Sequence, residues 1–313
     1  QRQMCIRDRD DWEVVIMRIL LVGGSGLVGT RLASYLAEQG NDVVCFNRTI
    51  PRGASRQCIY ETGDLGEYGL LYQIMKKYRV EQVIHNAAIS HPMLYRDNPY
   101  KVYRVNVTGT LNVLEAAKLF EVSRFIYISS GAVYGNTDSP VVYEEQKLHG
   151  ESPYGASKVA CEEIVRNYGL QTASLRVAFV YGPGRSMSCP VEQALRHAVK
   201  GEEMLLDKGA DQKMDYIYID DCVEAIGRIV NNRTLRYDAY NIGGGQLVPY
   251  SRVIDKVKAL YPKSRIAVGA GGLGYDDLGA MSIQRIEEDT GWKPGISIEE
   301  GIERYALWME KNI

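Results

Sequence analysis

The chain is poor in the residues that build metal sites and disulfide frameworks. Its 313 residues include only four histidines, and no two of them stand at metal-ligand spacing, so we expect no catalytic metal. The six cysteines are scattered and form no C-x-x-C pair. This usage is typical of reduced thiols in a cytoplasmic protein, and we expect that location.

An excess of one charge and long apolar runs are also missing. The net charge of −2 gives no basic surface for nucleic acid, and no apolar run reaches the length of a membrane span. We therefore expect neither nucleic acid nor a membrane as a partner. Residues 1–16 are charged and lack the apolar core of a secretory signal, and we expect a non-native or disordered leader before Met17.

A glycine-rich turn follows the first apolar run. Residues 19–22 predict a buried strand, and a helical pattern begins at Leu27. Glycines between a strand and a helix allow a pyrophosphate to approach the backbone, where the first N–H groups of the helix favour negative charge. An ordinary strand-to-helix turn is the alternative. The residues expected to bind a dinucleotide here are Gly23, Ser25, Gly26, Leu27 and Val28.

Strands and helices alternate over the first 180 residues, which predicts an α/β fold with a doubly wound parallel sheet. Residues 98–120 and 154–168 are expected to be helices, and residues 175–180 the sixth strand. We expect a dinucleotide-binding domain over residues 17–180, to which residues 215–242 return. The remaining segments, 181–214 and 243–313, are expected to form a smaller substrate domain.

The end of the second expected strand indicates which dinucleotide binds. Asn47 is neutral and Arg48 follows it, a pair that suits a 2′-phosphate, whereas an acid would suit a free 2′-hydroxyl. We therefore favour NADP, with NAD as the alternative. Asp64 and Leu65 follow the third strand, where the carboxylate either accepts from the adenine amino group or caps the next helix.

The strand over residues 82–85 ends in side chains small enough for a flat cofactor to lie against the backbone. These residues are Asn86, Ala87 and Ala88. Ser90 and His91 come just beyond, where ligands bind in open α/β sheets, so we expect both at the substrate. His85 lies within the apolar strand and is expected to be a packed core histidine.

Three residues suit proton transfer to or from an alcohol. Tyr154 and Lys158 are four apart, so a helix places both side chains on one face. A neighbouring ammonium favours the phenolate, and we expect Lys158 to lower the pKa of Tyr154. Ser130, at a strand end, is expected to orient the substrate oxygen. This relay matches hydride transfer at a secondary alcohol or ketone and needs no metal.

The motifs in this order resemble the extended short-chain dehydrogenases/reductases, a family of NAD(P)-dependent sugar epimerases, dehydratases and reductases. The resemblance spans Met17 to Asn312 and rests on the glycine turn, residues 83–88, 106–110, 129–135, 154–158 and 291–294. It implies that Tyr154 is the acid/base, that Lys158 also holds the nicotinamide ribose and that Asn106 approaches the cofactor. It also implies a homodimer formed through the helices at 98–120 and 154–168.

Departures from the family pattern bear on the substrate. Gly131 and Ala132 stand where the dehydratases carry an acidic pair, which argues against a 4,6-dehydratase. Phe179 and Met214 replace an Asn and an Arg that serve a nucleotide diphosphate in other members. Each lost charge-assisted contact is worth about 1.5–3 kcal/mol. Phe179 is still expected to lie at the substrate.

Three functions follow from the sequence. The leading one is an NAD(P)-dependent oxidoreductase acting on a secondary alcohol or ketone of a sugar-like substrate. The alternative is an NAD-dependent nucleotide-sugar epimerase similar to UDP-glucose 4-epimerase, because both reactions use the same relay. A non-catalytic cofactor-binding protein is the distant alternative.

Overall fold

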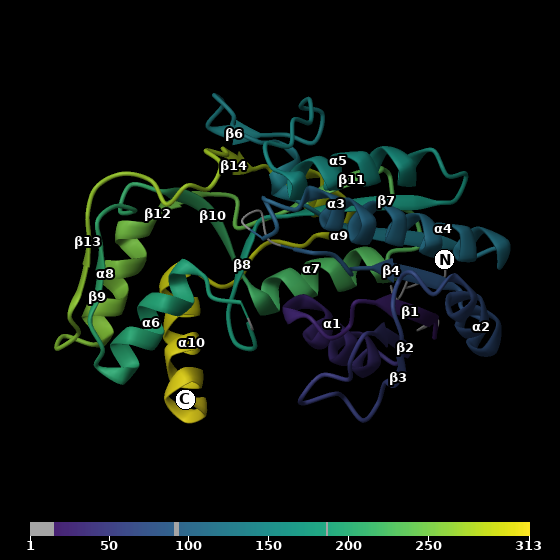
Figure 1. The fold of residues 1–313 in the computed structure, drawn as a ribbon, viewed down its shortest axis with the longest axis horizontal. Helices are drawn as coiled ribbons and strands as arrows, with labels where there is room; N and C mark the ends of the chain where they lie inside the picture. The colour runs from purple at the N-terminus through teal and green to yellow at the C-terminus, as the bar shows by residue number, and fades with distance from the viewer. Residues whose placement is uncertain (1–15, 91–93, 186) are drawn as a thin grey trace, which may run out of the picture.

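The larger part of the molecule is built around a seven-stranded parallel sheet. The computed structural model describes residues 16–90, 94–185 and 187–313. The strand order is β11-β7-β5-β4-β1-β2-β3, with helices on both faces (Figure 1). This confirms the predicted doubly wound α/β fold. The strands are β1 (Arg18–Val22), β2 (Asp42–Asn47), β3 (Ile59–Thr62), β4 (Gln82–His85), β5 (Arg124–Ser130), β7 (Thr172–Val177) and β11 (Ala239–Ile242).

Alternate residues of the strands enter two separate cores, as the pleat requires. In β1, Ile19 and Leu21 point to one face of the sheet, and Leu20 and Val22 point to the other. The first core lies under α1 (Leu27–Glu38) and α7 (Ile219–Asn231), and the second under α2 (Tyr68–Tyr78), α4 (Gly109–Leu119) and α5 (Pro153–Arg166). Both faces are therefore covered, and the ligand edge stays accessible.

A smaller part stands beside the carboxyl edge of the sheet (Figure 1). It is built around a three-stranded sheet of β8 (Phe179–Tyr181), β10 (Lys213–Tyr218) and β12 (Leu247–Pro249). Two strand pairs accompany it, β9 (Met204–Leu206) with β13 (Ile266–Val268) and β6 (Val141–Val142) with β14 (Ala280–Met281). Its helices are α6 (Pro190–Lys200), α8 (Tyr250–Leu260) and α10 (Ile298–Asn312), whereas α9 (Gln284–Thr290) packs against α7 and β11 of the larger part.

Two expected elements were wrong in detail. The strand expected over residues 175–180 is divided, because the chain leaves β7 at Ala178 and continues as β8, which pairs with β10 in the smaller sheet. An unbroken apolar run does not show which sheet each residue joins. The helix expected over 98–120 is α3 (Pro99–Tyr103), a π-helical turn η1 (Arg104–Thr108) and α4. Over the described ranges, no helix is long and apolar enough to cross a membrane.

Candidate active site

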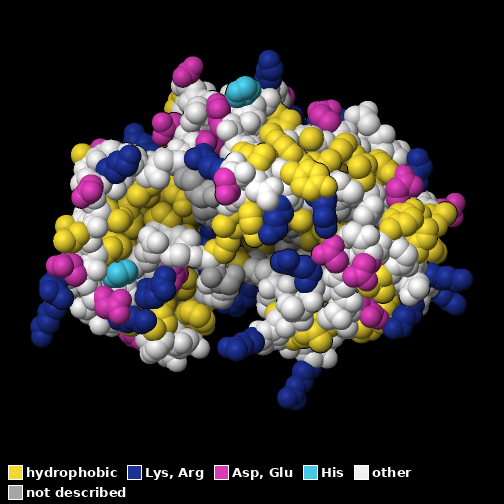
Figure 2. All heavy atoms as spheres, viewed as in Figure 1, with side chains coloured by type: hydrophobic (Ala, Val, Ile, Leu, Met, Phe, Trp, Pro, Cys, Tyr) yellow, Lys and Arg dark blue, Asp and Glu magenta, His cyan; other side chains and the backbone are white. Residues whose placement is uncertain are grey.

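A cavity of about 790 Å³ opens at the carboxyl ends of the sheet strands, between the two parts of the molecule. Lys and Arg side chains stand on both sides of this cleft (Figure 2). The smaller part contributes residues such as Met187, Met214 and Tyr275 to its wall. Among the residues singled out in the sequence, those that line the cavity are Gly23, Ser25, Gly26, Leu27, Val28, Asn47, Arg48, Asp64, Leu65, Asn86, Ala87, Ala88, Ser90, Ser130, Tyr154, Lys158 and Phe179.

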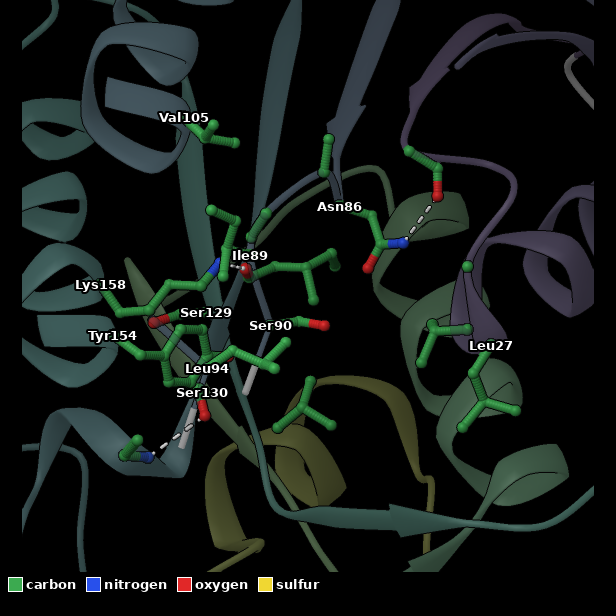
Figure 3. A pocket seen from close by; sticks show the side chains of 18 of the residues that line it. Leu27, Asn86, Ile89, Ser90, Leu94, Val105, Ser129, Ser130, Tyr154 and Lys158 are labelled. Atoms are coloured by element: carbon green, nitrogen blue, oxygen red, sulfur yellow. Dashed lines mark hydrogen bonds between the residues drawn. The ribbon is translucent and has the colours of Figure 1, made fainter. Parts of the chain in front are cut away.

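The glycine loop is held by contacts that exclude side chains. Gly23 has φ +90°, and a Cβ placed there would lie 2.5 Å from the backbone nitrogen of Ala87. The Asn86 amide donates to the Gly23 carbonyl at 3.0 Å (Figure 3). Gly26 begins α1 with open space around its Cβ position, and no described side chain caps this helix end. The free N–H groups of α1 therefore face the cavity, as a phosphate site requires.

The far end of the cavity carries the residues expected near an adenosine. Asn47 ends β2 with only 5% of its surface exposed, and neither atom of its amide has a hydrogen-bond partner among the described residues. Arg48 is exposed beside it. Asp64 accepts a 2.8 Å bond from the backbone N–H of Gly66, so it orders its own loop. A buried amide without partners is costly unless a ligand bonds it.

One described residue that we expected at the cofactor, Asn106, is not among the residues that line the cavity. Asn106 is buried behind it: its Oδ1 accepts from the Ile89 N–H at 2.8 Å and its Nδ2 donates to the Ser157 hydroxyl at 2.9 Å. These bonds join the loop after β4 to α5, and the expected approach of Asn106 to the cofactor stays a prediction. His91 lies outside the described residues. His85 is packed in the core, with its Nε2 2.9 Å from the Thr110 hydroxyl.

Ser130 and Tyr154 meet at the end of β5 (Figure 3). The Ser130 hydroxyl accepts from the Ala132 N–H at 3.2 Å, which fixes it at the start of the 3₁₀ turn η2 (Gly131–Val133). Tyr154 enters from the first turn of α5, whose start is capped by Ser152. Burial raises the pKa of Tyr154, while its hydrogen bond with Ser130 and the positive charge of Arg185 act in the opposite direction.

Lys158 points to the sheet rather than to the phenol oxygen. Its ammonium donates to the Ile128 carbonyl at 2.7 Å and lies 4.6 Å from the centre of the Tyr127 ring. Burial lowers the pKa of Lys158 to about 8. The expectation that Lys158 lowers the pKa of Tyr154 is wrong in this structure, because burial dominates and the opposing contributions come from Ser130 and Arg185.

Sequence reasoning gave little weight to the cations of the cavity. Besides Arg48, they come from the segment after β4 and from the smaller part of the molecule: Arg96, Lys101, Arg104, Arg185 and Lys213. None of the six makes an ion pair within the described part of the chain. Unpaired cations in one cleft attract an anionic ligand. Their spread over distant segments left no local pattern to find.

The family follows from comparison with known proteins. The NAD dependent epimerase/dehydratase family matches residues 19–243. The chain belongs to this family. A relative from Thermodesulfobacterium geofontis, named UDP-glucuronate 4-epimerase, is 27% identical, and the match covers 94% of this chain and 96% of the relative.

Two solved structures share the fold over nearly the whole of this chain. The Thermotoga maritima UDP-glucose 4-epimerase with UDP-glucose has a TM-score of 0.86 at 25% identity, covering 94% of this chain and 99% of that one. The protein MoeE5 in complex with UDP-glucuronic acid and NAD has a TM-score of 0.86 at 26% identity, covering 94% and 99%. Among the described residues, no group of histidine, cysteine and acidic side chains is arranged to hold a metal.

Replacing Gly26 by alanine tests the loop as a phosphate site. The added methyl has open space, so the melting temperature should change little, but it stands where a phosphate meets the N–H groups of α1. We expect the Kd for NAD to rise about tenfold in isothermal titration, a loss of about 1.4 kcal/mol. Gly69→Ala, on the exposed face of α2, is the control and should bind as wild type. Equal Kd values for both variants would contradict the assignment.

Asp215 makes stability depend on pH. Burial raises its pKa from 3.8 to about 7, although its carboxylate accepts N–H bonds from Met281 and Gly244. The native carboxyl keeps its proton between pH 4 and 7 while the unfolded chain loses it, so the free energy of unfolding falls as pH rises, by up to about 1.4 kcal/mol per pH unit. Asp215→Asn should flatten this slope in urea unfolding at pH 5 and pH 7. Parallel slopes would rule the effect out.

Proposed function

We propose that this protein is an NAD-dependent nucleotide-sugar 4-epimerase, which inverts a carbinol centre by transient oxidation. The supporting observation is that Ser130, Tyr154 and Lys158 line the same cavity as the glycine loop, in a chain of the epimerase/dehydratase family. The similar structures that contain UDP-glucose and UDP-glucuronic acid support a UDP-sugar as substrate. This is the alternative reading of the sequence, and it replaces net oxidation or reduction as the favoured one.

The cavity residues fit NAD. The backbone cradle at Gly23 leaves no room for a Cβ, and the uncapped start of α1 offers N–H groups to a pyrophosphate. The buried Asn47 amide, without partners among the described residues, suits the hydroxyls of an adenine ribose. In the sequence, Arg48 favours NADP because its charge suits a 2′-phosphate. In the structure that side chain is exposed, and the similar MoeE5 structure contains NAD. We therefore propose NAD.

Proton transfer is assigned to residues of the chain itself. When bound, NAD supplies the site that takes the hydride from the sugar carbon and gives it back. Tyr154, as the phenolate that Ser130 and Arg185 favour, would accept the proton of the hydroxyl that is oxidised, and the phenol so formed would return it after the sugar presents its other face. Ser130, whose hydroxyl lies beside Tyr154 in the cavity wall (Figure 3), is assigned to orient the reacting oxygen. Lys158, on the same face of α5, is assigned to the nicotinamide ribose.

The substrate side is assigned to the smaller part of the molecule, built mainly from residues 181–214 and 243–313. Met187, Met214 and Tyr275 from this part line the cavity opposite the glycine loop. Gly131 and Ala132 line it beside Ser130 and carry no carboxyl group, so the elimination of water by a 4,6-dehydratase has no acid at that position. This favours epimerisation over dehydration.

The assignment is tested by incubating the protein with NAD and either UDP-glucose or UDP-glucuronic acid. We expect the 4-epimer to form, followed by NMR, without net absorbance at 340 nm. Tyr154→Phe should lower kcat about 10²–10⁴-fold, since it removes the acid/base, while the Kd for NAD stays within twofold. Steady accumulation of NADH would instead identify a dehydrogenase.

The same assay separates the remaining alternatives. NAD binding without turnover of any sugar nucleotide would favour the non-catalytic protein. A Kd for NADP below that for NAD would restore the original cofactor preference. Loss of NAD binding in Tyr154→Phe would show that this residue acts in binding rather than in proton transfer.

We propose that the protein is a homodimer formed through α3, α4 and α5. Large apolar side chains are exposed on α3 and α4, among them Tyr100 at 72% and Leu119 at 57%. Sedimentation should give a dimer, and Leu119→Arg should dissociate it because a charge is costly inside an apolar interface. Leu307→Arg, equally exposed on α10, is the control and should leave the mass unchanged. A monomeric wild type would disprove the dimer.

A further inference from the structure

A buried ion pair lies directly behind the wall that carries Ser130. The Ser129 hydroxyl donates to Glu162 Oε1 at 2.5 Å. The Arg176 guanidinium grips both carboxylate oxygens of Glu162, with Nε 3.1 Å from each and Nη2 2.8 Å from Oε2. Glu162 is 1% exposed and Arg176 2%. One carboxylate therefore joins α5 to both β5 and β7.

The hydrogen-bond chain continues across the sheet to β11. Arg176 Nη1 donates to the Tyr134 hydroxyl at 2.9 Å and to the Glu144 carbonyl at 2.8 Å. Tyr134 in turn donates to Asn241 Oδ1 at 2.7 Å, and the Asn241 N–H donates to the Glu144 carboxylate at 2.9 Å. Each of these side chains is buried. The carboxylate of Glu162 is therefore held in a fixed frame that includes three strands of the large sheet.

Glu162 shares its helix face with the proposed proton-transfer residues. Tyr154, Lys158 and Glu162 follow one another at intervals of four along α5, so they lie on successive turns of one face. Ser129 directly precedes Ser130 on β5. A rotation of α5 that moved Glu162 away from Ser129 would also move Tyr154 relative to Ser130.

Stability alone does not account for this arrangement. The free energy lost by removing both charges from water is about as large as the attraction gained within the ion pair. Apolar side chains of the same volume often give a protein equal or greater stability. The ion pair instead fixes an orientation. A bidentate contact is made in one geometry, whereas an apolar contact tolerates small rotations of the helix. The observations therefore point to orientation of the helix.

We propose that Glu162 is a positioning residue, which fixes the rotation of α5 through Ser129 and Arg176 and presents its negative charge to Lys158. The inference rests on the proposed function, because it takes Tyr154 and Lys158 as the residues to be positioned. The described groups that act on Lys158 are consistent with it. Tyr127 of β5 offers its ring, His85 of β4 is neutral because burial lowers its pKa to about 3, and Tyr154 and Cys161 share α5.

The charge has a measurable consequence. Burial lowers the pKa of Lys158 to about 8, and Cys161 and the charge of Glu162 oppose that shift. If the carboxylate becomes an amide, the pKa of Lys158 falls further. If the alkaline limb of a pH profile reports loss of the proton from the Lys158 ammonium, that limb then moves to lower pH.

The experiment uses the double variant Glu162→Gln with Arg176→Gln, which removes both charges and leaves no isolated ion in the core. We expect it to fold and to bind NAD, with kcat for the UDP-sugar lowered about 10–100-fold, because small displacements of reacting groups have effects of that size. KM should change less than kcat. The alkaline limb of kcat, and that of the NAD affinity, should both move to lower pH, because Glu162 acts on the pKa of Lys158 whereas Arg176 is not among the groups that shift it.

Two further variants separate charge from geometry. Glu162→Asp keeps the charge but is too short to reach both partners, so it should lower kcat without moving the alkaline limb. Asp221→Asn is the matched control, a buried carboxylate that accepts from Gly295 and Ile296 outside the cavity. It should lower the melting temperature and leave kcat and the limb unchanged.

The outcomes decide between the hypotheses. Wild-type kcat and an unmoved limb in the double variant would overturn the proposal. If the double variant does not fold, wild-type kcat in Glu162→Asp overturns it instead. If the wild type binds NAD but epimerises no sugar nucleotide, the proposed function fails, and the pH dependence of the Kd for NAD still tests Glu162.

Discussion

The site depends on the close approach of two backbones, at Gly23 after β1 and Ala87 after β4. A Cβ at Gly23 would lie 2.5 Å from the nitrogen of Ala87, so the two chains touch without a side chain between them. The Gly23 N–H donates to the Phe46 carbonyl at 2.9 Å, and the Asn86 amide donates to the Gly23 carbonyl. Three strand ends are thereby joined. The free N–H groups of α1 owe their direction into the cavity to this contact.

Burial sets the proton chemistry at the other wall. It raises the pKa of Tyr154 and lowers that of Lys158 to about 8, because burial disfavours the charged form of each group. Ser130 and Arg185 are the described groups that favour the phenolate. Burial and these two groups therefore act on the pKa of Tyr154 in opposite directions, and a further charge near the buried phenol would shift that pKa again. Lys158 is buried in the same wall, and the charge of Glu162, on the same helix, raises its pKa against the effect of burial.

The sequence predicted the features that one short motif determines. It did not predict those that depend on contacts between distant elements. The glycine loop, Ser130 and the pair Tyr154 and Lys158 each follow from a short motif on one element, and the structure brings all of them to one cavity. The direction of the Lys158 ammonium toward Ile128 depends on β5, which no spacing within α5 reveals. The cations of the cavity come from segments far apart in the chain, and the split at Ala178 depends on which sheet offers a partner.

The same distinction applies to the substrate. Phe179 and Met214 lack the amide and guanidinium of other family members, which by residue type alone argues against a diphosphate. In the structure, however, the Arg185 guanidinium lies 5.4 Å from the centre of the Phe179 ring, held by a 2.7 Å bond from its Nη1 to the Val180 carbonyl. A cation therefore remains at that wall, supplied by a residue six positions further along the chain. The positive charge that an anionic substrate needs is supplied by the assembled cavity as a whole. The presence of Phe179 and Met214 at two positions does not remove it.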